Sequence, residues 1–179
     1  TAAPPPSHIA ICDLIASTNI ASRRDALGWS GWSCSGEGAQ RIATGLCAGT
    51  AWTGVTCNLT SISRLEMGFK SIRGTLPSSI GYLGGISTIL LYGNSLSGTI
   101  PPSITQLTGL TRLELNANQF TGNIPAGISA LSKLENLFLA NNQFKGPILE
   151  NMLTLPNIKS FWLQNNQFNG TIPSNIASL

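Results

Sequence analysis

The sequence predicts an α/β repeat solenoid, in which similar coils stack on one another and share a parallel β-sheet. Five units of 24 residues align without a gap, and they begin at Ile62, Ile86, Leu110, Leu134 and Ile158. Seven apolar positions recur in every unit and always hold Ile, Leu, Met or Phe. A glycine also recurs at one place in each unit. Self-similarity at a fixed period of this size is typical of repeat architectures.

Each unit is predicted to form one coil that begins with a short strand. In the third unit, Leu113 and Leu115 alternate with polar residues, so the leucines face the core and their neighbours face outward. The asparagine after the strand lies where the chain turns inward, and its amide is expected to satisfy backbone groups of its own and the adjacent coil. A glycine then permits a tight bend, and Ile124-Pro125 begins a loose helical or extended stretch on the convex side. The predicted structural ladder consists of Asn94, Asn118, Asn142 and Asn166.

The segment before Ile62 is expected to cap the first coil, whose apolar edge would otherwise face water. We predict a proline-rich extension over residues 1–8, a cap over residues 9–61 and the repeats over residues 62–179. The five repeats are 62–85, 86–109, 110–133, 134–157 and 158–179.

Composition narrows the class of protein. A hydrophobic content of 42% in 179 residues is enough for a continuous core. Only 9% of the residues are charged, against an average of about 25%, and a neutral polar surface suits an extracellular protein. The basic residues are scattered, which argues against nucleic acid and anionic membranes. No apolar run approaches the length of about 20 residues that spans a bilayer. A chain that begins at Thr1 fits a processed secreted protein or a fragment of a longer one.

The cysteines and two sequons agree with a secreted protein. The cysteine spacing matches neither a redox pair nor a zinc site, so disulfides and an oxidising compartment are expected. These cysteines are Cys12, Cys34, Cys47 and Cys57. Glycosylation is predicted at Asn58 and Asn169, which begin the two sequons. We therefore expect a secreted, cell-surface or wall protein, with neither a metal nor a cofactor.

The run Asn94-Ser-Leu96-Ser-Gly98-Thr-Ile100-Pro101 resembles the plant-specific subclass of extracellular leucine-rich repeats. This subclass includes receptor-kinase ectodomains, polygalacturonase-inhibiting proteins and extensin-linked wall proteins. The resemblance covers residues 62–179, and Trp52-Thr-Gly54-Val55-Thr-Cys57 matches the signature of the family's N-terminal cap. It implies a right-handed superhelix with the parallel sheet on its concave face.

The same resemblance implies details of the cap. The family's helical part corresponds to Leu14 to Trp29. Its disulfide pattern would join Cys12 to Cys34 and Cys47 to Cys57. The stretch from Ser35 to Leu46 departs from the family, in which the corresponding cysteines lie closer together.

Outward positions of the strands predict a binding surface on the concave face. Several of these exposed positions hold large apolar residues, although polar residues there would not lower stability. Exposed aromatic residues on a rigid sheet are favoured anchors for a partner. The alternative is that such residues simply suit strands. Arg64 and Arg112 are expected to neutralise Glu66 and Glu114. The candidate ligand-binding residues are Leu90, Tyr92, Arg112, Glu114, Phe138 and Trp162.

The sequence predicts a binding protein, not an enzyme. The only histidine, His8, is expected in a mobile terminus, and the carboxylates show no pairing suited to acid and base chemistry. The leading hypothesis is an extracellular recognition module that binds a protein, a peptide or a wall polysaccharide through its concave face.

Two alternatives remain open. One is a structural glycoprotein of a matrix, wall or filament that self-associates, suggested by the proline-rich start, the low charge and the sequons. The apolar layer of the last coil is expected to need a cover: further repeats would favour the recognition module, and a stacked subunit would favour the structural protein. The minor one is binding to ice or a carbohydrate lattice by polar residues along the bend. These residues are Ser97, Thr99, Thr121, Asn123, Asn169 and Thr171.

Overall fold

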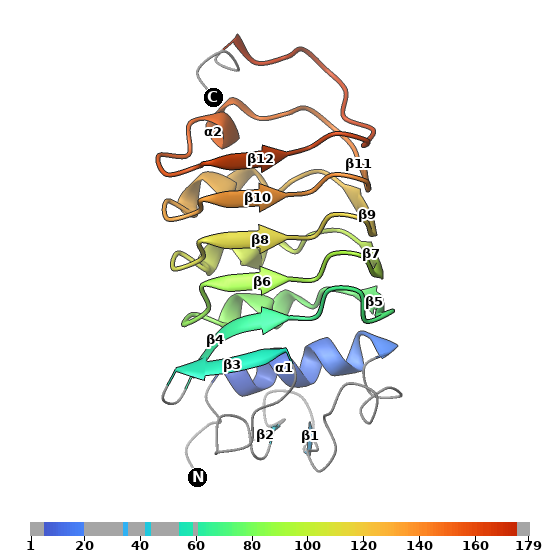
Figure 1. Ribbon diagram of the computed structural model, residues 1–179, viewed down its shortest axis with the longest axis vertical. Helices are drawn as coiled ribbons and strands as arrows, with labels where there is room; N and C mark the ends of the chain where they lie inside the picture. Colours follow the sequence, from blue (N-terminus) through green and yellow to red (C-terminus); the bar gives the residue numbers. More distant parts are fainter. Residues whose placement is uncertain (1–5, 20–33, 36–41, 44–53, 59–60, 175–179) are drawn as a thin grey trace.

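The computed structural model describes residues 6–19, 34–35, 42–43, 54–58 and 61–174. Coils stack along the long axis of the molecule, with the helix α1 beneath the first coil and the helix α2 in the fourth (Figure 1). Strands from successive coils pair in parallel, so the predicted repeat solenoid is confirmed.

The larger sheet receives one strand from each repeat. Partners in neighbouring strands lie 24 residues apart, as in the row of Leu65, Ile89 and Leu113. The order of its strands is β12-β10-β8-β6-β4-β3, and β3 pairs antiparallel with β4 at the N-terminal edge. The strands are β3 (Val55–Asn58), β4 (Ser61–Glu66), β6 (Thr88–Leu90), β8 (Arg112–Glu114), β10 (Asn136–Phe138) and β12 (Ser160–Trp162).

A second sheet follows the inward turn of each coil, where the sequence indicated only a bend. Its strands are β5 (Arg73–Thr75), β7 (Ser95–Gly98), β9 (Gln119–Gly122) and β11 (Gln143–Phe144). The chain then crosses the convex side in short helices. These are η3 (Ser78–Tyr82), η4 (Pro102–Gln106), η5 (Ala126–Ala130) and α2 (Glu150–Leu153). A proline precedes each of the three 3-10 helices, whereas Leu149 stands in that place before α2.

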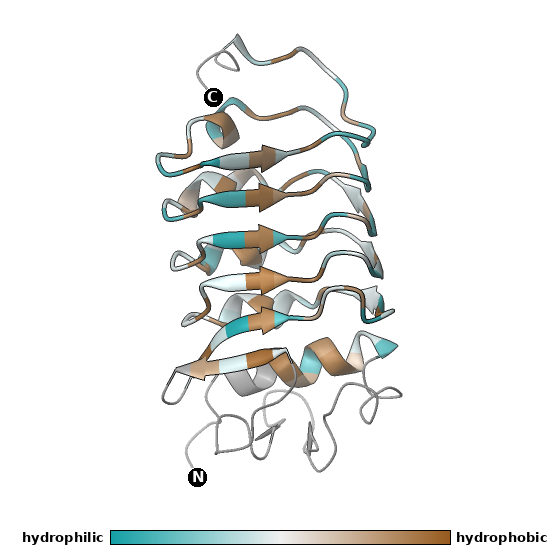
Figure 2. Ribbon diagram, viewed as in Figure 1, coloured by the Kyte–Doolittle hydropathy of each residue, from teal (hydrophilic) through white to brown (hydrophobic). Residues whose placement is uncertain are grey.

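The core runs through the middle of the stack, because the recurring apolar side chains of each coil lie on those of the next. Figure 2 shows hydrophobic residues in each strand of the larger sheet. Phe120 and Phe144 are completely buried, and their rings stack with centroids 6.0 Å apart. Phe168 continues this row at 6.3 Å from Phe144. In the last coil, Phe168 is only partly buried and Ile172 is 72% exposed.

The cap helix differs from the prediction. It is α1 (Pro6–Ala16), so it begins within the expected extension and includes His8, which was expected in a mobile terminus. Proline suits the first turn of a helix because its fixed φ is helical and its missing N–H has no partner there. After Ala16, the Ser17 and Thr18 hydroxyls both donate to the Leu14 carbonyl, a local bond that competes with helix continuation. Residues 20–29 of the expected helix lie outside the described residues.

Residues 17–19 of the cap, directly after α1, cover the N-terminal edge of the second sheet. Thr75 N–H donates to the Ser17 carbonyl at 3.0 Å, and Thr18 forms an antiparallel bridge with Gly74. Asn19 Oδ1 accepts from the Arg73 N–H at 2.7 Å. The strand β5 therefore has backbone partners on both sides.

Replacing Gly74 with alanine is expected to destabilise the protein by about 2 kcal/mol. Gly74 has a φ of +112°, and a Cβ there would meet the Ser17 carbonyl of the cap. Gly98→Ala is the matched control, because Gly98 also has positive φ (+76°) but faces the Thr75 side chain instead of the cap. Urea unfolding of both variants measures the difference. Equal losses would contradict a contribution from the cap contact.

Cys12 in α1 and Cys57 in β3 are both disulfide-bonded. The pairing of Cys12 with Cys34 and of Cys47 with Cys57 stays a prediction, and Cys47 lies outside the described residues. Within the described part of the chain, no helix is long and apolar enough to cross a membrane.

Candidate functional site

The larger sheet brings the outward strand residues of all five coils into rows. One row is formed by the last outward residue of each strand and contains four of the six candidates. Its members are Glu66, Leu90, Glu114, Phe138 and Trp162. Across the coils, the row therefore presents a carboxylate, an aliphatic side chain, a second carboxylate and then two aromatic rings.

Glu114 is a buried member of this row, with an exposed fraction of only 6%. The Arg112 guanidinium contacts its Oε1 through both Nε and Nη2, each at 2.5 Å. A buried carboxylate needs such a partner, because an uncompensated charge between Leu90 and Phe138 would be costly. The Arg112 side chain remains 48% exposed. Of the two candidates, Arg112 is thus the more exposed, and Glu114 is the buried partner of its guanidinium.

The two aromatic residues of the row stack on each other. The Phe138 and Trp162 ring centroids are 4.2 Å apart and their planes differ by 15°. Arg112 Cζ lies 6.0 Å from the Phe138 centroid on the next strand, within range of a cation–π contact. Trp162 is 48% exposed. Arg112, Phe138 and Trp162 thus follow one another across three strands, and we call them the Arg-Phe-Trp stack.

A second aromatic pair lies at the other end of the concave face. Tyr92 packs edge-on against Phe69, with centroids 5.2 Å apart and an interplanar angle of 87°. Phe69 is 75% exposed, more than any other large hydrophobic residue of the described part. Sequence reasoning missed Phe69. Aligning the repeats would have singled it out, because the other units hold Gly, Ala or Asn at this place.

The ladder asparagines direct their amides to backbone groups of the coils; Asn142 is buried, and the other three are half-buried. Each amide bridges two coils: for Asn118, Nδ2 donates to the Leu91 carbonyl at 3.0 Å and to the Leu115 carbonyl at 3.1 Å. Its Oδ1 accepts from the Leu96 N–H at 2.9 Å. Asn94, Asn142 and Asn166 make the corresponding bonds.

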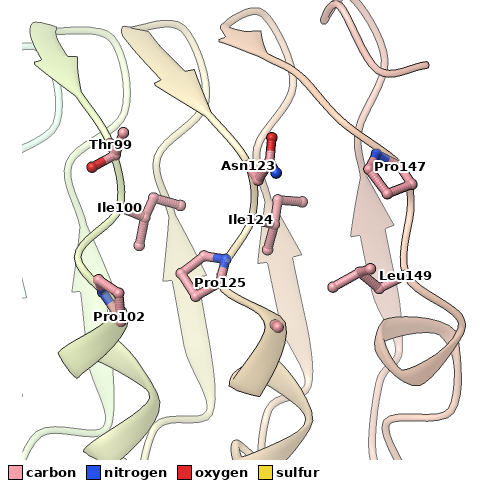
Figure 3. A pocket seen from close by; sticks show the side chains of 9 residues that line it. Thr99, Ile100, Pro102, Asn123, Ile124, Pro125, Pro147 and Leu149 are labelled. Atoms are coloured by element: carbon pink, nitrogen blue, oxygen red, sulfur yellow. The ribbon is translucent and has the colours of Figure 1, made fainter. Parts of the chain in front are cut away.

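A hollow of about 350 Å³ lies on the convex side of the second, third and fourth coils (Figure 3). Ile100, Ile124 and Pro125 are its buried residues, and Pro147 and Leu149 come from the fourth coil. Thr99 and Asn123 are its polar side chains. No residue that lines it is titratable, so it offers contact area without acid or base chemistry.

The remaining candidates have separate positions. Asn169 is exposed beside the bend at Gly170, and Asn58 ends β3. Glycosylation of both stays a prediction. Among the described residues, no group of three or more His, Cys, Asp or Glu side chains is placed to hold a metal ion.

Known proteins share this architecture. A leucine-rich-repeat family model matches residues 85–107, 109–131 and 157–179. A chain in the crystal structure of the BIR3–SERK2 complex from Arabidopsis thaliana is 30% identical, with a TM-score of 0.79, over 95% of this chain and 87% of that one. The BIR2 ectodomain from the same plant is 27% identical, with a TM-score of 0.78, over 96% of this chain and 85% of that one. A plant ice-binding protein is 25% identical, with a TM-score of 0.64, over 92% of this chain and 51% of its own. No curated protein matches the chain in sequence.

Proposed function

Because the chain belongs to the plant-type extracellular leucine-rich-repeat proteins, we propose that it is a non-enzymatic recognition module that works outside the cell. Its ligand is a protein or peptide, and the concave face binds it. One related structure is itself a complex of two such proteins, BIR3 and SERK2. A wall polysaccharide is the other ligand class that a neutral polar surface with exposed aromatic rings suits.

The Arg-Phe-Trp stack is the observation that carries this proposal. It combines an exposed indole with a guanidinium whose charge is anchored by a buried carboxylate. Tryptophan and arginine are the residues most enriched at the energetic centre of protein interfaces. The sheet beneath fixes their geometry before binding, so little conformational entropy is lost when a partner covers them.

Trp162→Ala is expected to weaken binding about 30-fold, which corresponds to about 2 kcal/mol. The partner would be a peptide selected on the wild-type protein from a random phage-displayed library and measured by calorimetry. Tyr82→Ala is the matched control, since Tyr82 is similarly exposed at 50% but lies in η3 on the convex side. Because Trp162 is half-exposed, the melting temperature should change little. Binding that survives Trp162→Ala and Phe138→Asp would move the site to another face.

Self-association is the rival function, and the last coil supports it. Ile158 and Phe161 line a hollow of about 400 Å³ on this coil, and Ile172 is 72% exposed. Either further chain or a stacked second copy would cover these side chains. Sedimentation velocity separates the two functions: a recognition module should stay monomeric on dilution, whereas a matrix protein should associate and lose that association in Ile172→Asp.

The lattice-binding alternative has weaker support. A lattice needs a repeated polar spacing, and the convex positions equivalent to Thr99 are interrupted by Pro147 in the fourth coil. The neighbouring column holds the cations Arg73 and Lys145. We therefore do not extend the likeness with the ice-binding protein to function.

A further inference from the structure

Phe69 occupies a backbone position that disfavours it. The third residue after each strand of the larger sheet adopts a left-handed conformation, with φ of 54° at Phe69 and 65° at Gly93. The other three equivalents, Ala117, Asn141 and Asn165, have φ between 55° and 59°. Glycine and asparagine adopt this conformation readily, whereas a bulky side chain there is an outlier. The chain thus accepts local strain in order to place a phenyl ring at this turn.

The surrounding residues make room for that ring and for its neighbour. A Cβ on Gly68 would come within 2.5 Å of the Tyr92 ring, and a Cβ on Gly93 would meet the Phe69 ring. Each of the first two coils therefore has a glycine under an aromatic ring of the other. We call Phe69 and Tyr92, held edge-to-face in this way, the aromatic ledge.

Packing in the core does not account for the presence of Phe69 in the ledge. Phe69 is 75% exposed, so its burial contributes little to folding, while its backbone strain opposes folding. Strained residues of this kind concentrate at binding sites, where the surrounding structure holds them in place. An exposed aromatic pair on a rigid turn is suited to receive an apolar side chain.

Charge near the ledge indicates what accompanies that side chain. Lys70 follows Phe69 directly, and Arg73 begins β5 on the same coil. Neither side chain forms an ion pair with another described residue, whereas Arg64, Arg112 and Lys159 are each paired with a glutamate. The unpaired charges that follow Phe69 in the first coil, among the described residues, are therefore positive, and complementary potentials favour an acidic partner.

We propose that the aromatic ledge binds an acidic peptide segment, with one apolar side chain packed on Phe69 and Tyr92 and flanking carboxylates directed to Lys70 and Arg73. This inference rests on the proposed function, because it assigns a partner chemistry to the N-terminal end of the same recognition surface. The ledge and the Arg-Phe-Trp stack then act as two separate anchors.

Phe69→Asn is the decisive variant, because a structural and a functional role for Phe69 predict opposite results. Asparagine is the residue that two other coils hold here, so strain relief should raise the melting temperature by about 2 °C. The probes are random dodecapeptides displayed on phage, selected on the wild-type protein, synthesised and measured by fluorescence anisotropy. Selected peptides should carry net negative charge and one large apolar residue. Their affinity should fall at least tenfold in Phe69→Asn.

Charge reversal tests the second half of the proposal. The double variant Lys70→Glu, Arg73→Glu should weaken the same peptides at least tenfold and remove most of the salt dependence of binding. Lys133→Glu is the control, since this exposed lysine lies on the turn that precedes β10. Its effect should be small.

Several outcomes would contradict the proposal that the ledge binds an acidic peptide. These are no enriched peptide, enrichment of neutral or basic peptides, and full affinity in Phe69→Asn. Self-association of the wild type that disappears in Phe69→Asn would identify a second copy as the occupant instead. If Trp162→Ala weakens peptide binding and Phe69→Asn does not, the proposed function is supported and the ledge has no role in binding. If only Phe69→Asn weakens peptide binding, the ledge is supported as an anchor and the Arg-Phe-Trp stack is not.

Discussion

Phe144→Ala is expected to lower the free energy of unfolding by about 4 kcal/mol, the largest effect of any substitution considered for this chain. Phe144 is completely buried and is the central ring of the row Phe120, Phe144, Phe168. Removing it leaves a cavity between the third and fifth coils, because the backbone on either side is fixed by the two sheets. A melting temperature lower by about 10 °C should accompany this loss.

Denaturant unfolding followed by circular dichroism measures this effect. Phe144→Leu retains most of the buried volume, and we expect it to cost about 1 kcal/mol. Phe168→Ala should cost less than Phe144→Ala, since Phe168 is only partly buried. Similar losses at Phe144 and Phe168 would contradict the view that burial between two coils sets the cost.

Asn142→Ala is expected to destabilise the protein by about 3 kcal/mol, although it removes only a small polar side chain. Nδ2 donates to the Leu115 carbonyl of the third coil at 2.9 Å and to the Leu139 carbonyl of its own coil at 3.1 Å. Oδ1 accepts from the Phe120 N–H at 2.9 Å. Alanine would leave these buried backbone groups without partners, and each such group is costly.

The matched control for Asn142→Ala is Lys70→Ala. Lys70 occupies the same place in the first coil, but its side chain makes no hydrogen bond with another described residue. Its replacement should change stability by less than about 0.5 kcal/mol. Amide hydrogen exchange adds a local measurement, since Phe120 should lose protection in Asn142→Ala. Unchanged exchange at Phe120 would show that the ladder bond does not hold that backbone.

The repeat made most of the fold predictable. Leu113 and Leu115 are fully buried, as the strand alternation predicted, and the same rule placed Phe138 and Trp162 side by side on the outer surface. These features depend only on residue type and period. The ion pair of Arg112 with Glu114 was also expected, because both residues project from one strand.

Features that depend on a specific environment were not predictable in the same way. The burial of Glu114 follows from the sizes of Leu90 and Phe138 on the adjacent strands, which a sequence pattern does not show. The cap has no repeat to guide the alignment, and the helical part expected from Leu14 to Trp29 shares only residues 14–16 with α1. Phe69 was not predicted, because the pattern of apolar positions does not include the turn where a positive φ favours glycine or asparagine.

The asparagine ladder also constrains how such a chain can change its length. Asn118 bonds backbone groups 22 and 27 residues earlier, and the same two separations recur at Asn142 and Asn166. Inserting or deleting a single residue within a coil would misalign these bonds, whereas adding or removing 24 residues restores every one of them. Duplication and unequal recombination of whole coils are thus the tolerated genetic changes. The concave face can therefore gain or lose complete coils while the coils that remain keep their geometry.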